Sequence, residues 1–196
     1  MSELRRTILD ASVEMVAEEG VRALSFRAVA RKAGVSHQAP YHIFGNHRGI
    51  LEAIAREGFS SLTQAMRAGA EKRGPDAMDA LEGCGLAYVE FAWQHVGHFR
   101  VMFQQSLVNI HDSENPMQEA LETHATLREI ARKAHEAGYG RGLEPDGIAL
   151  VCWSCVHGLA TLLNEGIVVA KGDLQGHTLG MLNQQCISDL GRLLRP

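Results

Sequence analysis

The segment from Ser25 to Asn46 constrains the fold more than any other part of the chain. Serines able to cap a helix stand at Ser25 and Ser36, and Gly34 between them can end the first helix and open a turn. Apolar residues of the first helix recur at the spacing i, i+3, i+4, i+7, at Phe26, Val29, Ala30 and Ala33. Two short helices joined by such a turn form a helix-turn-helix, whose second helix fits the major groove of DNA. The segment therefore predicts a DNA-binding module.

The remainder of the chain carries helical spacing and almost no strand signal. No segment alternates apolar and polar residues for long, and Val, Ile and Thr do not cluster between turns. We therefore predict an all-α protein of about nine helices. The predicted domains are a three-helix DNA-binding head over residues 1–50 and a helical effector-binding and dimerisation body over residues 51–196.

Charge is distributed unevenly between these two parts. Residues 1–50 hold seven Lys/Arg against five Asp/Glu, a net charge of +2, and residues 51–196 hold 12 against 18, a net charge of −6, which together give −4. A mildly basic head on an acidic body suits a protein that touches phosphates with one end.

The composition also bears on the compartment. Four scattered cysteines and the absence of a secretory signal indicate a reducing cytoplasm. The uncharged run from Ile148 to Leu163 falls short of the roughly 20 apolar residues that a membrane span needs. We therefore expect a cytoplasmic protein with no membrane partner.

The second helix of the motif presents short polar and planar side chains of the kind that read bases. Gln38 can pair with adenine, and His37 can reach guanine or a phosphate. The start of the fourth helix, at His47 and Arg48, offers unbonded N–H groups and positive charge to a phosphate. The candidate contacts to a double-stranded DNA operator are Ser25, Arg27, Ser36, His37, Gln38, Tyr41, His42, His47 and Arg48.

The segment from Tyr88 to Met117 is rich in aromatic residues and methionine. Such side chains either line a ligand cavity between helices or form ordinary core, and both interpretations remain open at this point. An aromatic-walled cavity would favour a hydrophobic or planar small-molecule effector. The candidate pocket residues are Tyr88, Phe91, Phe99, Met102, Phe103, Met117, His124 and Trp153.

The predicted eighth helix, from Pro145 to Gly166, is apolar on two sides. One helix can bury two faces only if it lies centrally in its domain or meets a partner subunit. Together with a ninth helix over roughly residues 177–194, it predicts a four-helix homodimer interface. The candidate interface residues are Trp153, His157, Ala160, Asn164, Leu182, Cys186 and Leu190. For His157 we also expect a hydrogen bond to a neighbouring helix.

The N-terminal 60 residues resemble the DNA-binding domain of the TetR/AcrR family of one-component transcriptional regulators. The matching residues are Ile8, Leu9, Ala11, Gly20, Ala30, Ala33, Gly34, Val35, Ser36, Tyr41, Phe44 and Leu51. That family usually carries a lysine where this chain has His47, which implies a weaker or pH-dependent phosphate contact there. The resemblance implies an all-helical homodimer, usually a repressor released by a small ligand.

Two further stretches resemble one subgroup of that family. The run from Trp153 to Gly158 is similar to its Trp-x-x-x-His-Gly signature, and the run from Ser36 to Tyr41 is similar to its recognition helix, Pro40 included.

We therefore predict a ligand-responsive DNA-binding regulator, most simply a repressor released from a palindromic operator, with no cofactor and no enzymatic activity. The alternatives are a thiol- or metal-responsive sensor on the same scaffold and a helical redox enzyme using Cys152 and Cys155. The latter pair has the CxxC spacing but falls in the middle of a helix, where its thiols lack the strand and helix start of redox enzymes. His95 and His98 would hold a metal only with a third ligand nearby, such as His124 or Cys84.

Overall fold

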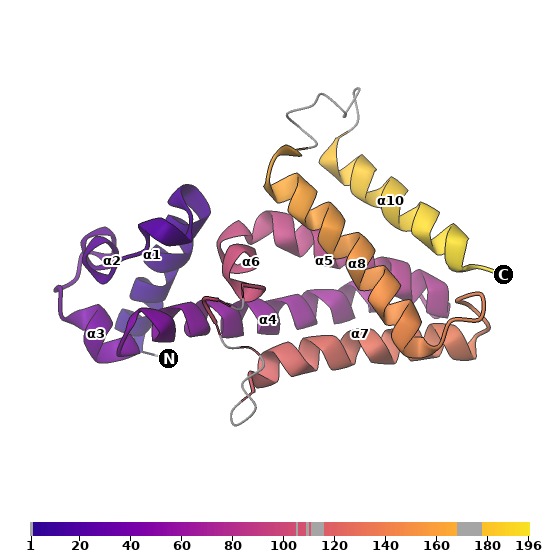
Figure 1. Ribbon diagram of the computed structural model, residues 1–196, viewed down its shortest axis with the longest axis horizontal. Helices are drawn as coiled ribbons and strands as arrows, with labels where there is room; N and C mark the ends of the chain where they lie inside the picture. Colours follow the sequence, from indigo (N-terminus) through magenta and orange to yellow (C-terminus); the bar gives the residue numbers. More distant parts are fainter. Residues whose placement is uncertain (1, 105, 109, 111–115, 168–177) are drawn as a thin grey trace. The chain divides into compact units, whose positions relative to one another are not determined.

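The structure is a computed structural model that describes residues 2–104, 106–108, 110, 116–167 and 178–196 (Figure 1). These residues form nine α-helices, one short 3-10 helix and no strand, as the predicted all-α class requires. The elements are α1 (Glu3–Glu19), η1 (Val21–Ala23), α2 (Phe26–Ala33), α3 (Ala39–Phe44), α4 (His47–Lys72), α5 (Ala77–Gln94), α6 (Val96–Met102), α7 (Gln118–Glu136), α8 (Pro145–Asn164) and α10 (Leu179–Leu194).

The chain divides into two compact units. Unit 1 comprises Met1–Ser60 and His95–Leu121, and unit 2 comprises Ser61–Gln94 and Glu122–Pro196. The predicted domain boundary at residue 50 falls inside α4, and the first unit also takes in α6, which the sequence analysis assigned to the body. Helices α4 and α7 each contribute residues to both units.

In unit 1, local signals set the first two helices of the motif. The Ser25 hydroxyl accepts a hydrogen bond from the Ala28 amide at 3.3 Å, so Ser25 is the predicted N-cap of α2. Gly34 ends α2 in the left-handed conformation (φ 67°), and the Val35 amide donates to the Ala30 carbonyl at 3.0 Å. These caps hold α2 at the turn that the sequence predicts.

The start of the recognition helix differs from the prediction. We expected Ser36 to cap it, but α3 begins at Ala39 with Gln38 in the cap position, and Ser36 lies in the preceding turn. The reason is Pro40: a proline lacks the N–H that an interior helical position needs, whereas the first turn leaves its N–H groups unbonded in any case. The later start places Pro40 in that first turn.

Helix α6 packs tightly against α1 within unit 1. A Cβ atom at Gly97 would lie 2.3 Å from the Val13 carbonyl oxygen, so the two backbones approach as closely as only glycine permits. The Arg100 guanidinium donates to the carbonyls of Val16 and Ala17 and satisfies the C-terminal end of α1. The module that carries the recognition helix is therefore fixed to α6 as well as to its own helices.

Unit 2 is built on α5, with α8 and α10 packed against it and against each other (Figure 1). One close contact again requires glycine: a Cβ at Gly83 of α5 would lie 2.2 Å from the Gly69 carbonyl oxygen of α4. This backbone contact fixes how closely α4 and α5 pack.

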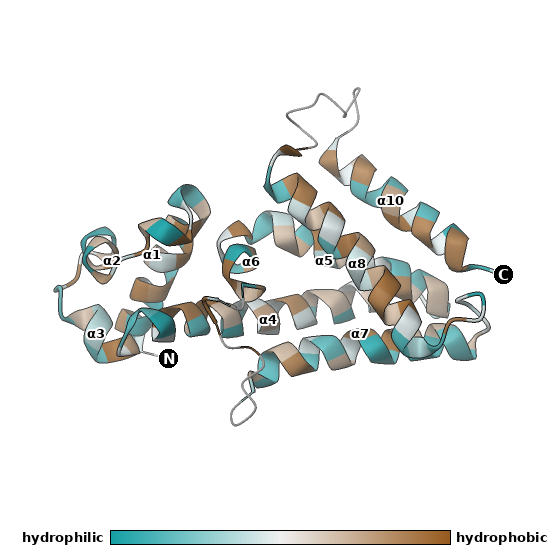
Figure 2. Ribbon diagram, in the orientation of Figure 1, coloured by the Kyte–Doolittle hydropathy of each residue, from teal (hydrophilic) through white to brown (hydrophobic). Residues whose placement is uncertain are grey.

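Helix α8 has hydrophobic residues along most of its length (Figure 2). By length and composition alone it could cross a membrane, and it is the one described helix that meets that test. It packs on α5 and α10, however, with Ile148, Cys152 and Ala160 buried. Packing within the chain therefore accounts for part of its apolar character, while Leu150, Val151 and Leu162 are exposed.

Candidate nucleic-acid interface

The nine residues predicted to contact DNA all lie in unit 1, and all of them are exposed. They come from the turn between α2 and α3, from α3 itself and from the first residues of α2 and α4. The structure thus collects on one module a set of polar side chains that the helix-turn-helix prediction requires to reach a groove.

Tyr41 combines a fixed ring with an accessible surface. Its ring packs edge-on against the Phe26 ring at a centroid distance of 4.6 Å, and 56% of the residue remains exposed. Since Phe26 is buried, the contact orients Tyr41 without hiding it. This is the arrangement expected of a tyrosine that rests on the scaffold and offers its hydroxyl to a phosphate.

His47, at the start of α4, contacts the protein backbone. Its Nε2 lies 2.7 Å from the Leu24 carbonyl oxygen, directly before α2, so that Nε2–H donates to this carbonyl. The imidazole ties the start of α4 to the start of α2, a role that the sequence analysis did not foresee. The main-chain N–H groups at the start of α4 remain the simplest anion-binding feature at this end of the helix.

The corner between α3 and α4 is closed by backbone contacts. Asn46 caps α4 by accepting a hydrogen bond from the Gly49 amide at 3.0 Å, as the sequence predicts. A Cβ at Gly49 would lie 2.1 Å from the Phe44 carbonyl oxygen. Only glycine fits at this position without a shift of the chain.

The predicted effector residues are divided between the two units. Phe99, Met102, Phe103 and Met117 belong to unit 1, where Met102 and Met117 are fully buried and Phe103 stacks edge-on with Phe59 and Phe99. In unit 1 these side chains form ordinary core. The other four, Tyr88, Phe91, His124 and Trp153, belong to unit 2.

In unit 2 two predicted effector residues, Tyr88 and Trp153, form a hydrogen-bonded chain between α5 and α8 together with His157, which was predicted for the dimer interface. The Trp153 indole N–H lies 3.4 Å from the Tyr88 hydroxyl oxygen, and that hydroxyl lies 2.8 Å from Nδ1 of His157. The expected bond from His157 to a neighbouring helix is therefore present. Burial lowers the pKa of His157 and raises the pKa of Tyr88, so at neutral pH the hydroxyl donates to an uncharged imidazole.

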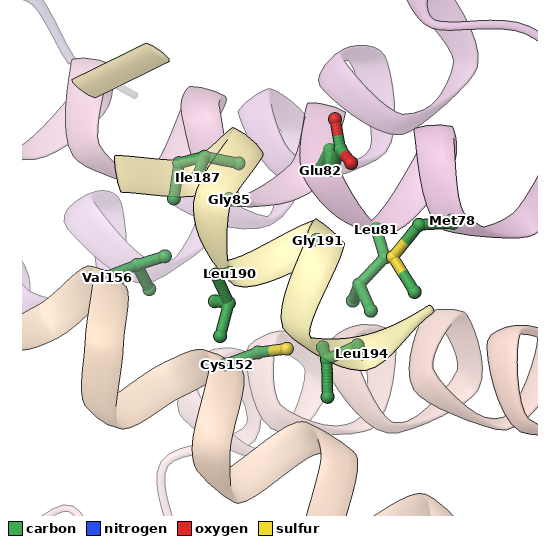
Figure 3. A pocket seen from close by; sticks show the side chains of 10 residues that line it. All are labelled: Met78, Leu81, Glu82, Gly85, Cys152, Val156, Ile187, Leu190, Gly191 and Leu194. Atoms are coloured by element: carbon green, nitrogen blue, oxygen red, sulfur yellow. The ribbon is translucent and has the colours of Figure 1, made fainter. Parts of the chain in front are cut away.

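Two cavities open among α5, α8 and α10. The first has about 20 Å³ of space, room for about one water, and is lined by Met78, Leu81, Glu82, Gly85, Cys152, Val156, Ile187, Leu190, Gly191 and Leu194 (Figure 3). The second has about 260 Å³ and is lined by Leu86, Val89, Glu90, Trp93, Gln94, Leu163, Leu179, Gly180, Asn183 and Gln184. Of the two, only the second has room for a small organic molecule.

Asn183 in the wall of the larger cavity was missed by sequence reasoning. Its amide donates to the Leu86 carbonyl at 3.2 Å, while its buried Oδ1 has no hydrogen-bond partner among the described residues. The helical spacing could have indicated that Asn183 is buried, since it shares a helix stripe with Ile187, Gly191 and Leu194, all of which are buried. A polar residue in such a stripe marks a position where packing alone does not explain the side chain.

The α8 residues predicted for the dimer interface make contacts with α5 of the same chain. Ala160 is buried, Asn164 donates to the Ala92 carbonyl, and Trp153 and His157 contact Tyr88, while Trp153, His157 and Asn164 remain partly exposed. The exposed apolar side chains of α8 are instead Leu150, Val151 and Leu162. On α10, Leu182, Cys186 and Leu190 remain partly exposed.

The sequence raised a metal site and a CxxC thiol pair only as alternatives. Within the described residues no three His, Cys, Asp or Glu side chains gather as a metal site, and His98 pairs with Glu57 at 3.0 Å. Cys152 lines the small cavity, whereas Cys155 contacts Cys186 of α10. The CxxC spacing does not define the thiol pair.

Comparisons with known proteins match both halves of the chain. Residues 8–54 match the family model described as bacterial regulatory proteins, tetR family, and residues 81–175 match a tetracyclin repressor-like C-terminal domain. Among curated relatives, the uncharacterized HTH-type transcriptional regulator YobS of Bacillus subtilis is 28% identical over 109 residues, 55% of this chain and 53% of that protein. The HTH-type transcriptional regulator BetI of Escherichia coli is 37% identical over 62 residues, 32% of each chain. The chain thus aligns with about half the length of the first relative and a third of the second.

Solved structures extend the likeness over the whole chain. A protein of unknown function from Rhodococcus sp. RHA1 has a TM-score of 0.80 at 29% identity. The alignment covers 100% of this chain and 97% of the Rhodococcus chain. A tetR-family bacterial regulatory protein from Rhodococcus RHA1 has a TM-score of 0.77 at 20% identity, with 100% and 98% covered. At that identity the second structure establishes a common fold alone.

Proposed function

Because this chain belongs to the TetR family of transcriptional regulators, we propose that it is a homodimeric repressor that a small hydrophobic effector releases from a palindromic DNA operator. The observation that carries the proposal is the exposure of all nine predicted contact residues on the helix-turn-helix of unit 1. The protein would act in the cytoplasm. The Trp153-to-Gly158 run supports assignment to the Trp-x-x-x-His-Gly subgroup.

The proposed readout of DNA uses α3. Gln38 pairs with a base edge in the major groove, and Tyr41 positions the helix through a phosphate. Arg27 and Arg48, both exposed, add phosphate contacts on either side of the recognition helix. A single α3 reads too few base pairs, and two copies spaced by about one turn of DNA (roughly 34 Å) read a palindrome.

The proposed dimer interface uses the uncovered faces of α8 and α10. On α8, Val151, Gly158 and Leu162 fall on one stripe, and nothing lies within 4 Å of a Cβ built at Gly158. On α10, Met181 and Leu193 are 51% and 68% exposed. Apolar stripes on two adjacent helices match what a four-helix interface between two copies buries.

The proposed effector site lies in unit 2. Its support is the cavity of about 260 Å³, whose wall holds Trp93 and the unpartnered Oδ1 of Asn183. The predicted effector residues Tyr88, Phe91, His124 and Trp153 do not line this cavity. A ligand with a flat apolar body suits such a wall. Coupling of about 1–3 kcal/mol between effector and operator would change DNA affinity roughly 5–150-fold.

The test of DNA recognition is selection of bound sequences from random duplex DNA, followed by gel-shift titration on the selected site. We expect a palindrome, and we expect Gln38→Ala to lose roughly 5–150-fold in affinity, or about 1–3 kcal/mol, for that site. Gln64→Ala is the matched control, because Gln64 is an exposed glutamine of unit 2 that lines neither cavity. No preference among duplexes at low ionic strength would refute the proposed function.

The test of the dimer interface is the mass of the protein in solution. Leu162→Glu places a charge on the exposed stripe of α8, and we expect it to yield a monomer with weakened operator binding. Leu4→Glu is the control, since Leu4 is exposed to a similar extent (45% against 42%) but lies on α1. A Leu162→Glu protein that remains dimeric would exclude this face.

A further inference from the structure

Two of the four cysteines are in contact across two helices. Sγ of Cys155 on α8 lies 3.7 Å from Sγ of Cys186 on α10, and both side chains are partly exposed. No disulfide joins any of the four cysteines, so both thiols are reduced in this structure. A disulfide needs its sulfurs at about 2.05 Å, so the two side chains must turn toward each other to form one.

The other two thiols are poor candidates for the same chemistry. Cys84 and Cys152 are buried, and burial raises the pKa of each to about 12, so neither ionises near neutral pH. Cys152 also faces the small cavity with apolar neighbours around it (Figure 3). Reactivity toward oxidants is therefore restricted to the pair that bridges α8 and α10.

We propose that Cys155 and Cys186 are a covalent modification site, oxidised by hydroperoxides to an intramolecular disulfide that ties α8 to α10. The Cys155 thiolate attacks one oxygen of the hydroperoxide, which breaks the O–O bond, forms a sulfenic acid on Cys155 and releases an alcohol, or water when the oxidant is hydrogen peroxide. The Cys186 sulfur then attacks the Cys155 sulfur, the S–O bond breaks, and a second oxygen leaves as water. In total the two thiols lose two electrons and two protons, and the hydroperoxide takes them up.

Burial, and after it the neighbouring Cys155, raise the pKa of Cys186, which favours Cys186 as the resolving thiol. The contact between the two sulfurs places Cys186 next to the position where a sulfenic acid would form on Cys155. Cys186 attacks only once a sulfenic acid has formed beside it.

Both cysteines lie on the helices of the proposed dimer interface, so a hydroperoxide would reach them in the monomer, and the regulatory consequence of the site rests on the proposed function. Cys155 occupies the same stripe of α8 as Val151, Gly158 and Leu162, and Cys186 follows Leu182 by one turn on α10. A disulfide would remove the freedom of α8 and α10 to shift against each other at the middle of these stripes. We therefore expect oxidation to change operator affinity.

The first experiment identifies the bond. Reduced full-length protein is treated with hydrogen peroxide or cumene hydroperoxide, remaining thiols are blocked, and the digest is mapped by mass spectrometry without reductant. We expect one cross-linked peptide pair that contains Cys155 and Cys186, reversed by dithiothreitol, and a monomeric band on a non-reducing denaturing gel. Cys152→Ala keeps the cross-link, whereas Cys186→Ser leaves a sulfenic acid on Cys155 that a dimedone probe captures.

Several results would overturn the site: blocked thiols at both positions after oxidation, a cross-link between two chains, or a bond that includes Cys152. The second experiment titrates the selected operator with reduced and oxidised protein. A reversible change of roughly 5-fold or more that is absent in Cys155→Ser supports the regulatory role, and a cross-link without any change refutes that role. If neither form prefers any duplex, the proposed function fails while the peptide map still decides the modification site.

Discussion

Unit 1 and unit 2 use their polar side chains in opposite ways. In unit 1 the predicted contact residues are exposed, and Tyr41 is fixed by packing of its ring rather than by hydrogen bonds to other side chains. In unit 2 Tyr88, Trp153 and His157 bond to one another between α5 and α8, while leucines are exposed on the outer faces of the helices. The exposed side chains of unit 1 can thus contact a partner without rearrangement. In unit 2, a ligand that forms a hydrogen bond with Tyr88, Trp153 or His157 must first break a hydrogen bond within the protein.

The largest effect we expect comes from filling a helix contact in unit 1. Gly97→Ala would place a Cβ 2.3 Å from the Val13 carbonyl oxygen, and such overpacking costs about 3 kcal/mol. The free energy of unfolding from urea titration measures it. Gly158→Ala is the control, because nothing lies within 4 Å there and the exchange should stabilise α8 by up to about 1 kcal/mol. Equal effects of the two changes would mean that α1 and α6 do not touch.

A second test separates stability from DNA binding through two matched helix caps. The Ser25 hydroxyl caps α2 in unit 1, and the Thr178 hydroxyl caps α10 in unit 2, each with an amide at 3.3 Å. Either change to alanine should cost about 1 kcal/mol of stability, measured by thermal unfolding. Only Ser25→Ala should also weaken operator binding, by more than the loss of folded protein in that variant accounts for. Equal losses of binding in both variants would remove Ser25 from the contact set.

A smaller effect is expected inside unit 2. Tyr88→Phe removes the donor to Nδ1 of His157 and should destabilise the protein by about 0.5–1.5 kcal/mol, since a half-buried acceptor loses its partner. Urea titration again measures the change, with Tyr139→Phe, which loses a bond to Asp76, as the comparison. No loss on Tyr88→Phe would mean that the hydrogen-bonded chain does not persist in solution.

The smallest effect we expect is a loss of stability at acidic pH. Burial lowers the pKa of His157 below its ordinary value of 6.5, so the unfolded state takes up a proton more readily than the folded state does. Above the unfolded pKa the residue is neutral in both states and contributes nothing. Stability then falls as the pH drops through about 6.5, and the fall levels off below the folded pKa. The difference in unfolding free energy between pH 7.5 and 5.5 should therefore be smaller in His157→Asn than in the unaltered protein.

The sequence predicted best where the signals are local. The caps at Ser25 and Asn46 and the turn at Gly34 are each decided by neighbours within four residues, and the structure has all of them. The same module matches the tetR family model over residues 8–54. The error at Ser36 is also local. The cost of Pro40 at the fourth helical position was underestimated, and the helix starts later, at Ala39.

Prediction was weakest where two faces of one helix carry similar residues. On α8 the stripe with Ala160 and the stripe with Leu162 are both apolar, and only the position of α5 decides which one is covered. In the same way, three-residue spacing suggested Cys152 as the partner of Cys155, whereas the contact comes from Cys186, 31 positions away. Contacts of that kind depend on tertiary packing, which periodicity within a helix does not encode.

The closed corner at Gly49 has a consequence for altering which promoter the protein reads. Because a Cβ at Gly49 would lie 2.1 Å from the Phe44 carbonyl oxygen, any larger residue there would force the joint between α3 and α4 to shift. New preferences would have to come from exchanging the side chains of residues 36–42 on an unchanged frame. A library for retargeting should therefore vary those positions and leave the joint behind them untouched.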